Sequence, residues 1–99
     1  MQILLGIDVG GSTTKIVAVG PTKQVVDTLQ VEAKDQTTSL FGAIGSILAK
    51  NGLSLAQISK IVLTGVGANI VGDSIYDIPT YKVAEFRAIG LGGLNLSGL

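Results

Sequence analysis

One aspartate lies inside an apolar segment near the N-terminus. Asp8 is surrounded by the apolar residues of segment 3–9, where an unpaired carboxylate would be costly to bury. A carboxylate on a rigid strand suits the coordination shell of Mg²⁺ beside a polyphosphate, directly or through water. The alternative is an aspartate that accepts hydrogen bonds from the following turn. The residues after Asp8 favour the magnesium function.

The segment after this strand combines glycines, hydroxyl groups and one cation. Its members are Gly10, Gly11, Ser12, Thr13, Thr14 and Lys15. The glycines allow a tight turn, the hydroxyls and exposed N–H groups suit phosphate oxygens, and Lys15 supplies a positive charge. The simpler alternative is an ordinary hairpin, since Gly-Gly is a common two-residue turn. The segment lacks the Walker A spacing, and it leads into a strand where a Rossmann fingerprint leads into a helix.

The composition limits the chemistry that this chain can perform. Of 99 residues, 46% are hydrophobic and 14% are charged, which predicts one compact domain. Seven basic and seven acidic residues cancel and form no basic run, so nucleic acid and anionic membranes are not expected partners. The absence of Cys and His removes thiol and imidazole chemistry. The apolar N-terminus is too short for a signal peptide or a membrane span, which favours a cytoplasmic protein.

Three strands and a helix are expected in the first half. The apolar character of 3–9 and 14–19 and the β-branched residues of 24–31 predict a three-stranded antiparallel meander. An amphipathic helix follows, with N-cap hydroxyls among residues 37–39 and a stop at 51–52, where the sequence is Asn-Gly.

The second half is expected to alternate strands and helices. We predict a buried strand at 60–64, a short helix at 70–75, a strand at 81–83 and a glycine-rich helix at 84–94. The order β-β-β-α-β-α-β-α indicates one α/β domain with a mixed sheet. The final residues keep an apolar pattern, so we expect the chain to be part of a longer protein.

Two levels of family resemblance are carried by these residues. GIDVGGSTTKIV resembles the first phosphate motif of the acetate and sugar kinase, heat-shock chaperone and actin superfamily. That resemblance implies a ribonuclease H-like fold that binds ATP and Mg²⁺ between two domains, of which residues 1–99 are the first. The segments 61–65, 78–79 and 83–86 resemble, in order and spacing, those of type II pantothenate kinases. The narrower resemblance implies phosphorylation of pantothenate, the first step of coenzyme A biosynthesis, by a homodimer formed through the second domain.

Glu85 is the candidate general base. It follows a predicted strand at the start of a predicted helix, where a carboxylate could receive the proton of a substrate hydroxyl. The alternative is a solvent-exposed glutamate in the first turn of a helix, favoured by the helix dipole. The pantothenate kinase resemblance implies the catalytic role. Gly65 and Gly67 either line the substrate cleft or form a plain turn, and Thr64 has no assigned role.

Two other functions stay open. An ATPase activator of the hydroxyacyl-CoA dehydratase type shares the first phosphate motif, although it is expected to carry cluster-ligating cysteines and this chain has none. A non-catalytic nucleotide-binding domain is the second possibility, because a fold does not fix a function.

Overall fold

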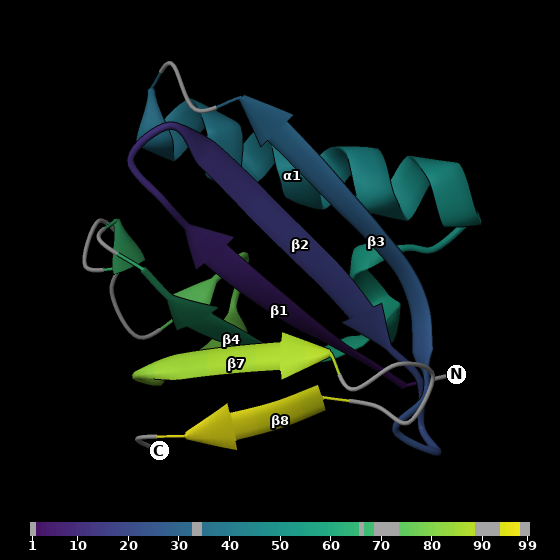
Figure 1. Cartoon of the computed structure of the whole chain (residues 1–99). Helices are drawn as coiled ribbons and strands as arrows, with labels where there is room; N and C mark the ends of the chain where they lie inside the picture. Colours follow the sequence, from purple (N-terminus) through teal and green to yellow (C-terminus); the bar gives the residue numbers. More distant parts are fainter. Residues whose placement is uncertain (1, 33–34, 66, 69–73, 89–93, 98–99) are drawn as a thin grey trace.

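A computed structural model describes residues 2–32, 35–65, 67–68, 74–88 and 94–97 of the chain (Figure 1). The described part contains strands and two helices in this order: β1 (Ile3–Val9), β2 (Thr13–Val19), β3 (Val25–Glu32), α1 (Gln36–Asn51), a 3-10 helix (Leu55–Gln57), β4 (Ile58–Thr64), β5 (Ser74–Ile75), β6 (Ile78–Lys82), β7 (Glu85–Ala88) and β8 (Leu94–Ser97). The mixed α/β architecture expected from the sequence is confirmed.

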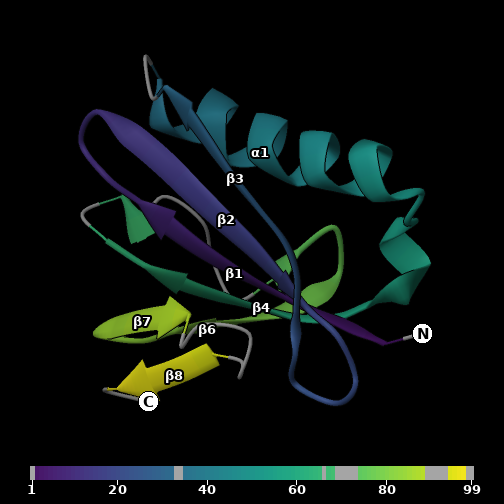
Figure 2. The same ribbon diagram turned by 45° about the vertical axis from the view of Figure 1, so that its right-hand side comes forward.

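The main sheet has six strands in the order β3-β2-β1-β4-β6-β5. Strands β1, β2 and β3 form the predicted antiparallel meander. Strand β4 returns after α1 and pairs parallel with β1, and β6 pairs parallel with β4. Helix α1 covers one face of this sheet, and the β7–β8 hairpin lies on the other side (Figures 1 and 2).

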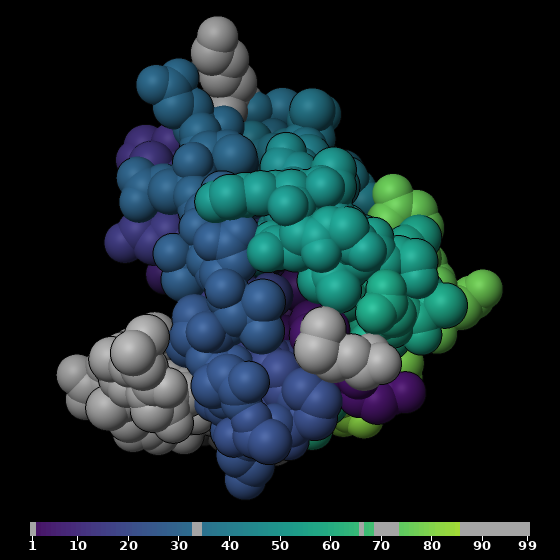
Figure 3. Space-filling model, turned by 90° about the vertical axis from the view of Figure 1, so that its right-hand side faces the viewer, coloured from purple at the N-terminus to yellow at the C-terminus, as the bar shows by residue number. Residues whose placement is uncertain are grey.

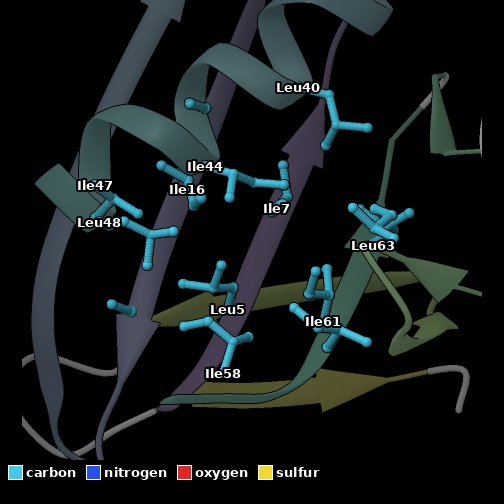
Figure 4. Packing of buried hydrophobic residues seen from close by; sticks show 14 of the residues in the cluster. Leu5, Ile7, Ile16, Leu40, Ile44, Ile47, Leu48, Ile58, Ile61 and Leu63 are labelled. Atoms are coloured by element: carbon cyan, nitrogen blue, oxygen red, sulfur yellow. The ribbon is translucent and has the colours of Figure 1, made fainter. Parts of the chain in front are cut away.

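The core lies between the sheet and α1. In β1 the alternate residues Ile3, Leu5, Ile7 and Val9 are fully buried, as the period of two in a half-covered strand requires. They meet buried side chains of α1, β2 and β4, including Ile44, Ile16 and Ile61 (Figure 4). Truncation of such a side chain to alanine generally costs about 2–5 kcal/mol. This packing makes β1 a rigid support for Asp8.

The N-terminus of α1 differs from the prediction. Asp35 is the N-cap, and its carboxylate accepts hydrogen bonds from the backbone N–H and the hydroxyl of Thr38. Residues 37–39 therefore lie inside the first turn, and the prediction that they supply the N-cap is wrong. The short Asp35 side chain reaches the free N–H groups from the residue before the helix. The Thr38 side-chain hydrogen bond lowers the pKa of Asp35, because it favours the ionised carboxylate.

The C-terminus of α1 is fixed against β3. Gly52 ends the helix with φ of 63°, the left-handed conformation that glycine adopts readily, as predicted from Asn51-Gly52. The carboxylate of Asp27 accepts a hydrogen bond of 2.9 Å from Nδ2 of Asn51 and pairs with Nζ of Lys50 at 3.3 Å. The Asn51 hydrogen bond is the main cause that lowers the pKa of Asp27. On the molecular surface, β3 lies beside the C-terminal part of α1 (Figure 3).

The second half of the chain contains more strand than predicted. The helix expected at 84–94 is wrong at 85–88 and at 94, because Glu85–Ala88 and Leu94–Ser97 form an antiparallel pair of strands, while 89–93 lie outside the described residues. The helix expected at 70–75 is wrong at Ser74–Ile75, which is strand β5, while 70–73 lie outside the described residues. Strand β6 begins at Ile78, earlier than the predicted 81.

Candidate functional site

The carboxyl ends of three parallel strands meet at one edge of the main sheet. Strands β1, β4 and β6 run in the same direction, so their last residues lie side by side. The ends of β1 and β4 and the beginning of β7 lie at this edge in both ribbon views (Figures 1 and 2). Open α/β sheets bind their ligands at this kind of edge.

Three polar side chains form a row across β2, β1 and β4. Asp8 pairs with Lys15 in the antiparallel register and with Thr64 in the parallel register. Directly paired residues point to the same face of a sheet, and this is the face opposite α1. Lys15 is exposed, Asp8 is partly exposed and Thr64 is buried. A cation and a carboxylate are thus neighbours where the strands end.

The turn between β1 and β2 is open at its tip. The backbone N–H of Gly10 donates to the carbonyl oxygen of Thr13 at 2.9 Å and closes the turn. A Cβ atom on Gly10 would lie 2.8 Å from that oxygen, so the turn itself requires glycine there. A Cβ atom on Gly11 would meet no atom within 4 Å. Gly11 and Ser12 are exposed, and their backbone is open to an anion.

The two threonines after the turn face opposite sides of the sheet. Thr13 is on the face of Asp8 and Lys15 and is partly exposed. The Thr14 side chain is on the α1 face and is fully buried. In the described part of the chain, the Thr14 hydroxyl has no hydrogen-bond partner. The phosphate-binding role assigned to residues 10–15 stays a prediction.

The loop after β4 packs closely against the end of β1. Gly65 has φ of 96°, and a Cβ atom there would lie 2.5 Å from the carbonyl oxygen of Val9 and 2.6 Å from Oδ1 of Asp8. The backbone N–H of Gly67 donates to the same Val9 oxygen at 3.0 Å. A Cβ atom on Gly67 would lie 2.5 Å from Cγ1 of Val9, so close packing against the end of β1 favours glycine at both positions. A substrate cleft lined by these glycines, one of the two alternatives expected from the sequence, stays a prediction.

Helix α1 supports the turn from the other side. Nε2 of Gln36, the first residue of the helix, donates to the carbonyl oxygen of Gly10 at 3.1 Å. A Cβ atom on Gly67 would lie 3.0 Å from Cδ of Gln36. Gln36 therefore contacts both the turn and the loop after β4. No sequence motif indicated it, because the contact joins residues 26 positions apart.

Glu85 is exposed at the first position of β7. Because β7 is a strand, the explanation of Glu85 as a first-turn helix residue no longer holds. The residue before it, Ala84, accepts a hydrogen bond of 2.7 Å from the hydroxyl of Thr64, the last residue of β4. The start of β7, with Glu85, therefore lies beside the carboxyl end of β4. The catalytic role of Glu85 stays a prediction.

The metal ligands available here fit Mg²⁺ held mainly by a nucleotide. Among the described residues, no group of three or more His, Cys, Asp or Glu side chains could hold a metal ion. Mg²⁺ commonly takes one or two carboxylates from the protein and fills its shell with water and substrate phosphates. A single aspartate beside an open turn suits that pattern. In the same described part, no helix is long and apolar enough to cross a membrane.

Comparison with known proteins shows the fold. No family model matches the sequence, and no curated protein matches it. Among solved structures, it is similar to the activator of the 2-hydroxyisocaproyl-CoA dehydratase from Clostridium difficile with bound ADPNP, with a TM-score of 0.67 and 23% identity over 82% of this chain. Component A of the (R)-2-hydroxyglutaryl-CoA dehydratase from Acidaminococcus fermentans gives a TM-score of 0.64 and 24% identity over 71% of this chain.

The fold is that of the actin-like ATPases. A third similar structure is that of a nucleotide-free acetone carboxylase, which carries out ATP-dependent acetone carboxylation. It gives a TM-score of 0.52 and 27% identity over 65% of this chain and 10% of the carboxylase. The chain covers 29% and 27% of the two dehydratase proteins, less than a third of their lengths. The ribonuclease H-like fold expected from the phosphate motif is confirmed, and these neighbours give no support to pantothenate kinase in particular.

Proposed function

We propose that this chain is the phosphate-binding part of an ATP-dependent enzyme. The observation that carries the proposal is the row of Lys15 and Asp8 beside the open tip at Gly11 and Ser12. A cation and exposed backbone N–H groups suit phosphate oxygens, and a carboxylate suits the Mg²⁺ that accompanies ATP. The neighbour with bound ADPNP supports a nucleotide as the ligand.

Each group has a defined task in this proposal. The turn and Lys15 hold the phosphates and offset their negative charge, while Asp8 orients the hydrated Mg²⁺ when it is bound. The rigid packing of β1 keeps these groups in place before ATP arrives. Phosphoryl transfer depends mainly on such positioning and electrostatic stabilisation.

The comparisons favour an ATPase of the dehydratase-activator type over a kinase. The first two similar structures are an activator and a component of hydroxyacyl-CoA dehydratases. In such an enzyme the acceptor of the phosphoryl group is water. The cluster-ligating cysteines expected of an activator are absent from these 99 residues, so this function requires them in a further part of the protein.

Phosphorylation of pantothenate is the second candidate, and the position of Glu85 favours it. An exposed carboxylate near the edge that carries Asp8 suits a general base for an alcohol acceptor. The pantothenate and coenzyme A assignments rest on the resemblance of segments 61–65, 78–79 and 83–86. The same resemblance implies that a pantothenate kinase of this type is a homodimer formed through its second domain.

A coupled assay of ADP release by the full-length protein separates these possibilities. It is run with Mg²⁺ and ATP, with and without pantothenate, on the wild type and on Glu85→Gln. Asp77→Asn is the matched control, because Asp77 is also an exposed carboxylate but lies in the turn between β5 and β6. ADP release that needs pantothenate and is lost in Glu85→Gln supports the kinase.

ADP release without pantothenate that survives Glu85→Gln supports the ATPase. A wild-type protein that neither binds ATP nor releases ADP refutes the proposal that this is a nucleotide site. The Asp77→Asn protein is expected to behave as the wild type in every arm of the assay.

A further inference from the structure

Two hydrogen bonds attach the segment before β7 to the end of β4. The hydroxyl of Thr64 donates to the carbonyl oxygen of Ala84 at 2.7 Å. The backbone N–H of Val83 donates to the carbonyl oxygen of Leu63 at 2.9 Å. The first is a side-chain bond, so it depends on the residue type at position 64. The second joins two backbone groups, so it does not depend on the side chain at position 63.

Thr64 is linked both to Asp8 and to the segment that precedes Glu85. It pairs with Asp8 in the β1–β4 register, on the sheet face that also carries Lys15. Its bond partner is the carbonyl group that directly precedes Glu85. The Thr64 side chain therefore connects the strand that neighbours Asp8 with the segment that carries Glu85, the predicted base.

The energetics favour a geometric role over a role in stability. Thr64 is only 5% exposed, whereas Ala84 is exposed. If the hydroxyl were removed, water could replace it at the Ala84 carbonyl, so the free energy of unfolding would change little. Water would not hold residue 84 at a fixed distance from β4. The position of Glu85 would then become less defined.

We propose that Thr64 is a positioning residue: its hydroxyl holds the chain at Ala84 and thereby keeps Glu85 at the sheet edge where Asp8 binds Mg²⁺ and nucleotide. This inference rests on the second candidate of the proposed function, in which Glu85 is the general base. Misplacement of a reacting group by about 1 Å can reduce a rate by roughly 100-fold. Loss of the Thr64 bond is expected to lower kcat by roughly 10- to 100-fold and to leave the KM for ATP near its wild-type value.

The test compares Thr64→Val, which keeps the shape and removes the hydroxyl, with Thr64→Ser, which keeps the hydroxyl. Both are measured in the full-length protein by ADP release, under the acceptor condition in which the wild type turns over. Thr64→Ser is expected to retain most of kcat, and Thr64→Val to lose it. Should Thr64→Val fold poorly in a thermal melt, Thr64→Ala provides the same comparison with Thr64→Ser.

Thr80→Val is the matched control. The Thr80 hydroxyl also donates to a backbone carbonyl, that of Ile78 at 3.2 Å, but it lies within β6 and away from the site. This variant is expected to keep the wild-type kcat. Equal kcat values for Thr80→Val and Thr64→Val would overturn the proposal.

A double-mutant cycle tests whether Thr64 acts through Glu85. In the Glu85→Gln background, Thr64→Val is expected to cause no further loss of kcat. A full additional loss would show that Thr64 acts independently and would overturn the positioning role. A wild-type protein without ATP turnover would refute the proposed function itself, whereas normal wild-type turnover that Thr64→Val leaves unchanged would refute only the role of Thr64.

Discussion

Two glycines with positive φ offer a direct test of the packing beside Asp8. Gly52 has φ of 63° and open space where a Cβ atom would lie, whereas Gly65 has φ of 96° and backbone atoms of Val9 within 2.9 Å of that position. Gly52→Ala introduces only the cost of a left-handed alanine, about 1–2 kcal/mol. Gly65→Ala adds an overlap that rigid backbone cannot relieve by rotation, about a further 1–3 kcal/mol.

We therefore expect Gly65→Ala to reduce the free energy of unfolding by about 1–3 kcal/mol more than Gly52→Ala does. Urea unfolding followed by circular dichroism measures both values on the full-length protein. Because the added Cβ atom would also lie 2.6 Å from Oδ1 of Asp8, Gly65→Ala should weaken ATP binding, and Gly52→Ala should not. Equal losses of stability in the two variants would refute the close approach of the β4 loop to β1.

Three further predictions concern buried and capping groups. Thr14→Val should raise the free energy of unfolding by about 1 kcal/mol, because it replaces a buried hydroxyl that has no partner among the described residues; a loss of stability in urea unfolding would contradict this. Asp27 has a pKa below its usual 3.8, so it stabilises the fold above that pH and loses this effect as the pH falls through its folded pKa; Asp27→Asn should flatten the acid limb of a stability–pH curve, and an unchanged limb would count against it. Asp35→Ala should lower the melting temperature more than Asp35→Asn, which keeps a capping acceptor for Thr38; equal melting temperatures would argue against the cap.

The sequence predicted the first half of the fold well, for a physical reason. The strands at 3–9 and 14–19 are long apolar segments separated by a glycine turn, and the helix has a glycine at its C-terminus, so local signals agree with the tertiary structure. The helix start was missed because several neighbouring residues can cap. Asp35 does so in the structure.

The C-terminal hairpin was mispredicted although a local signal was present. In Glu85–Ala88 and Leu94–Ser97 polar and apolar residues alternate, which is the period of a strand. Each segment has only four residues, and the glycines between them obscured the pattern. With segments this short, the strand and helix patterns were hard to separate by periodicity.

The candidate site was predicted in part. Asp8 and Lys15 follow from a single motif, because a two-residue turn places them opposite each other. The contributions of Thr64 and Gln36 depend on the pairing of β1 with β4 and on the packing of α1, which join distant positions. No local pattern encodes such contacts.

Titration of the full-length protein with ATP in the presence of Mg²⁺, by isothermal calorimetry, tests the central claim most directly. The variants are Asp8→Asn, which removes the proposed magnesium carboxylate, and Asp77→Asn, its matched control in the β5–β6 turn. We expect the wild type and Asp77→Asn to bind ATP with equal affinity, and Asp8→Asn to lose the part of that affinity that depends on Mg²⁺. Equal Mg²⁺-dependent binding by all three proteins would contradict the account.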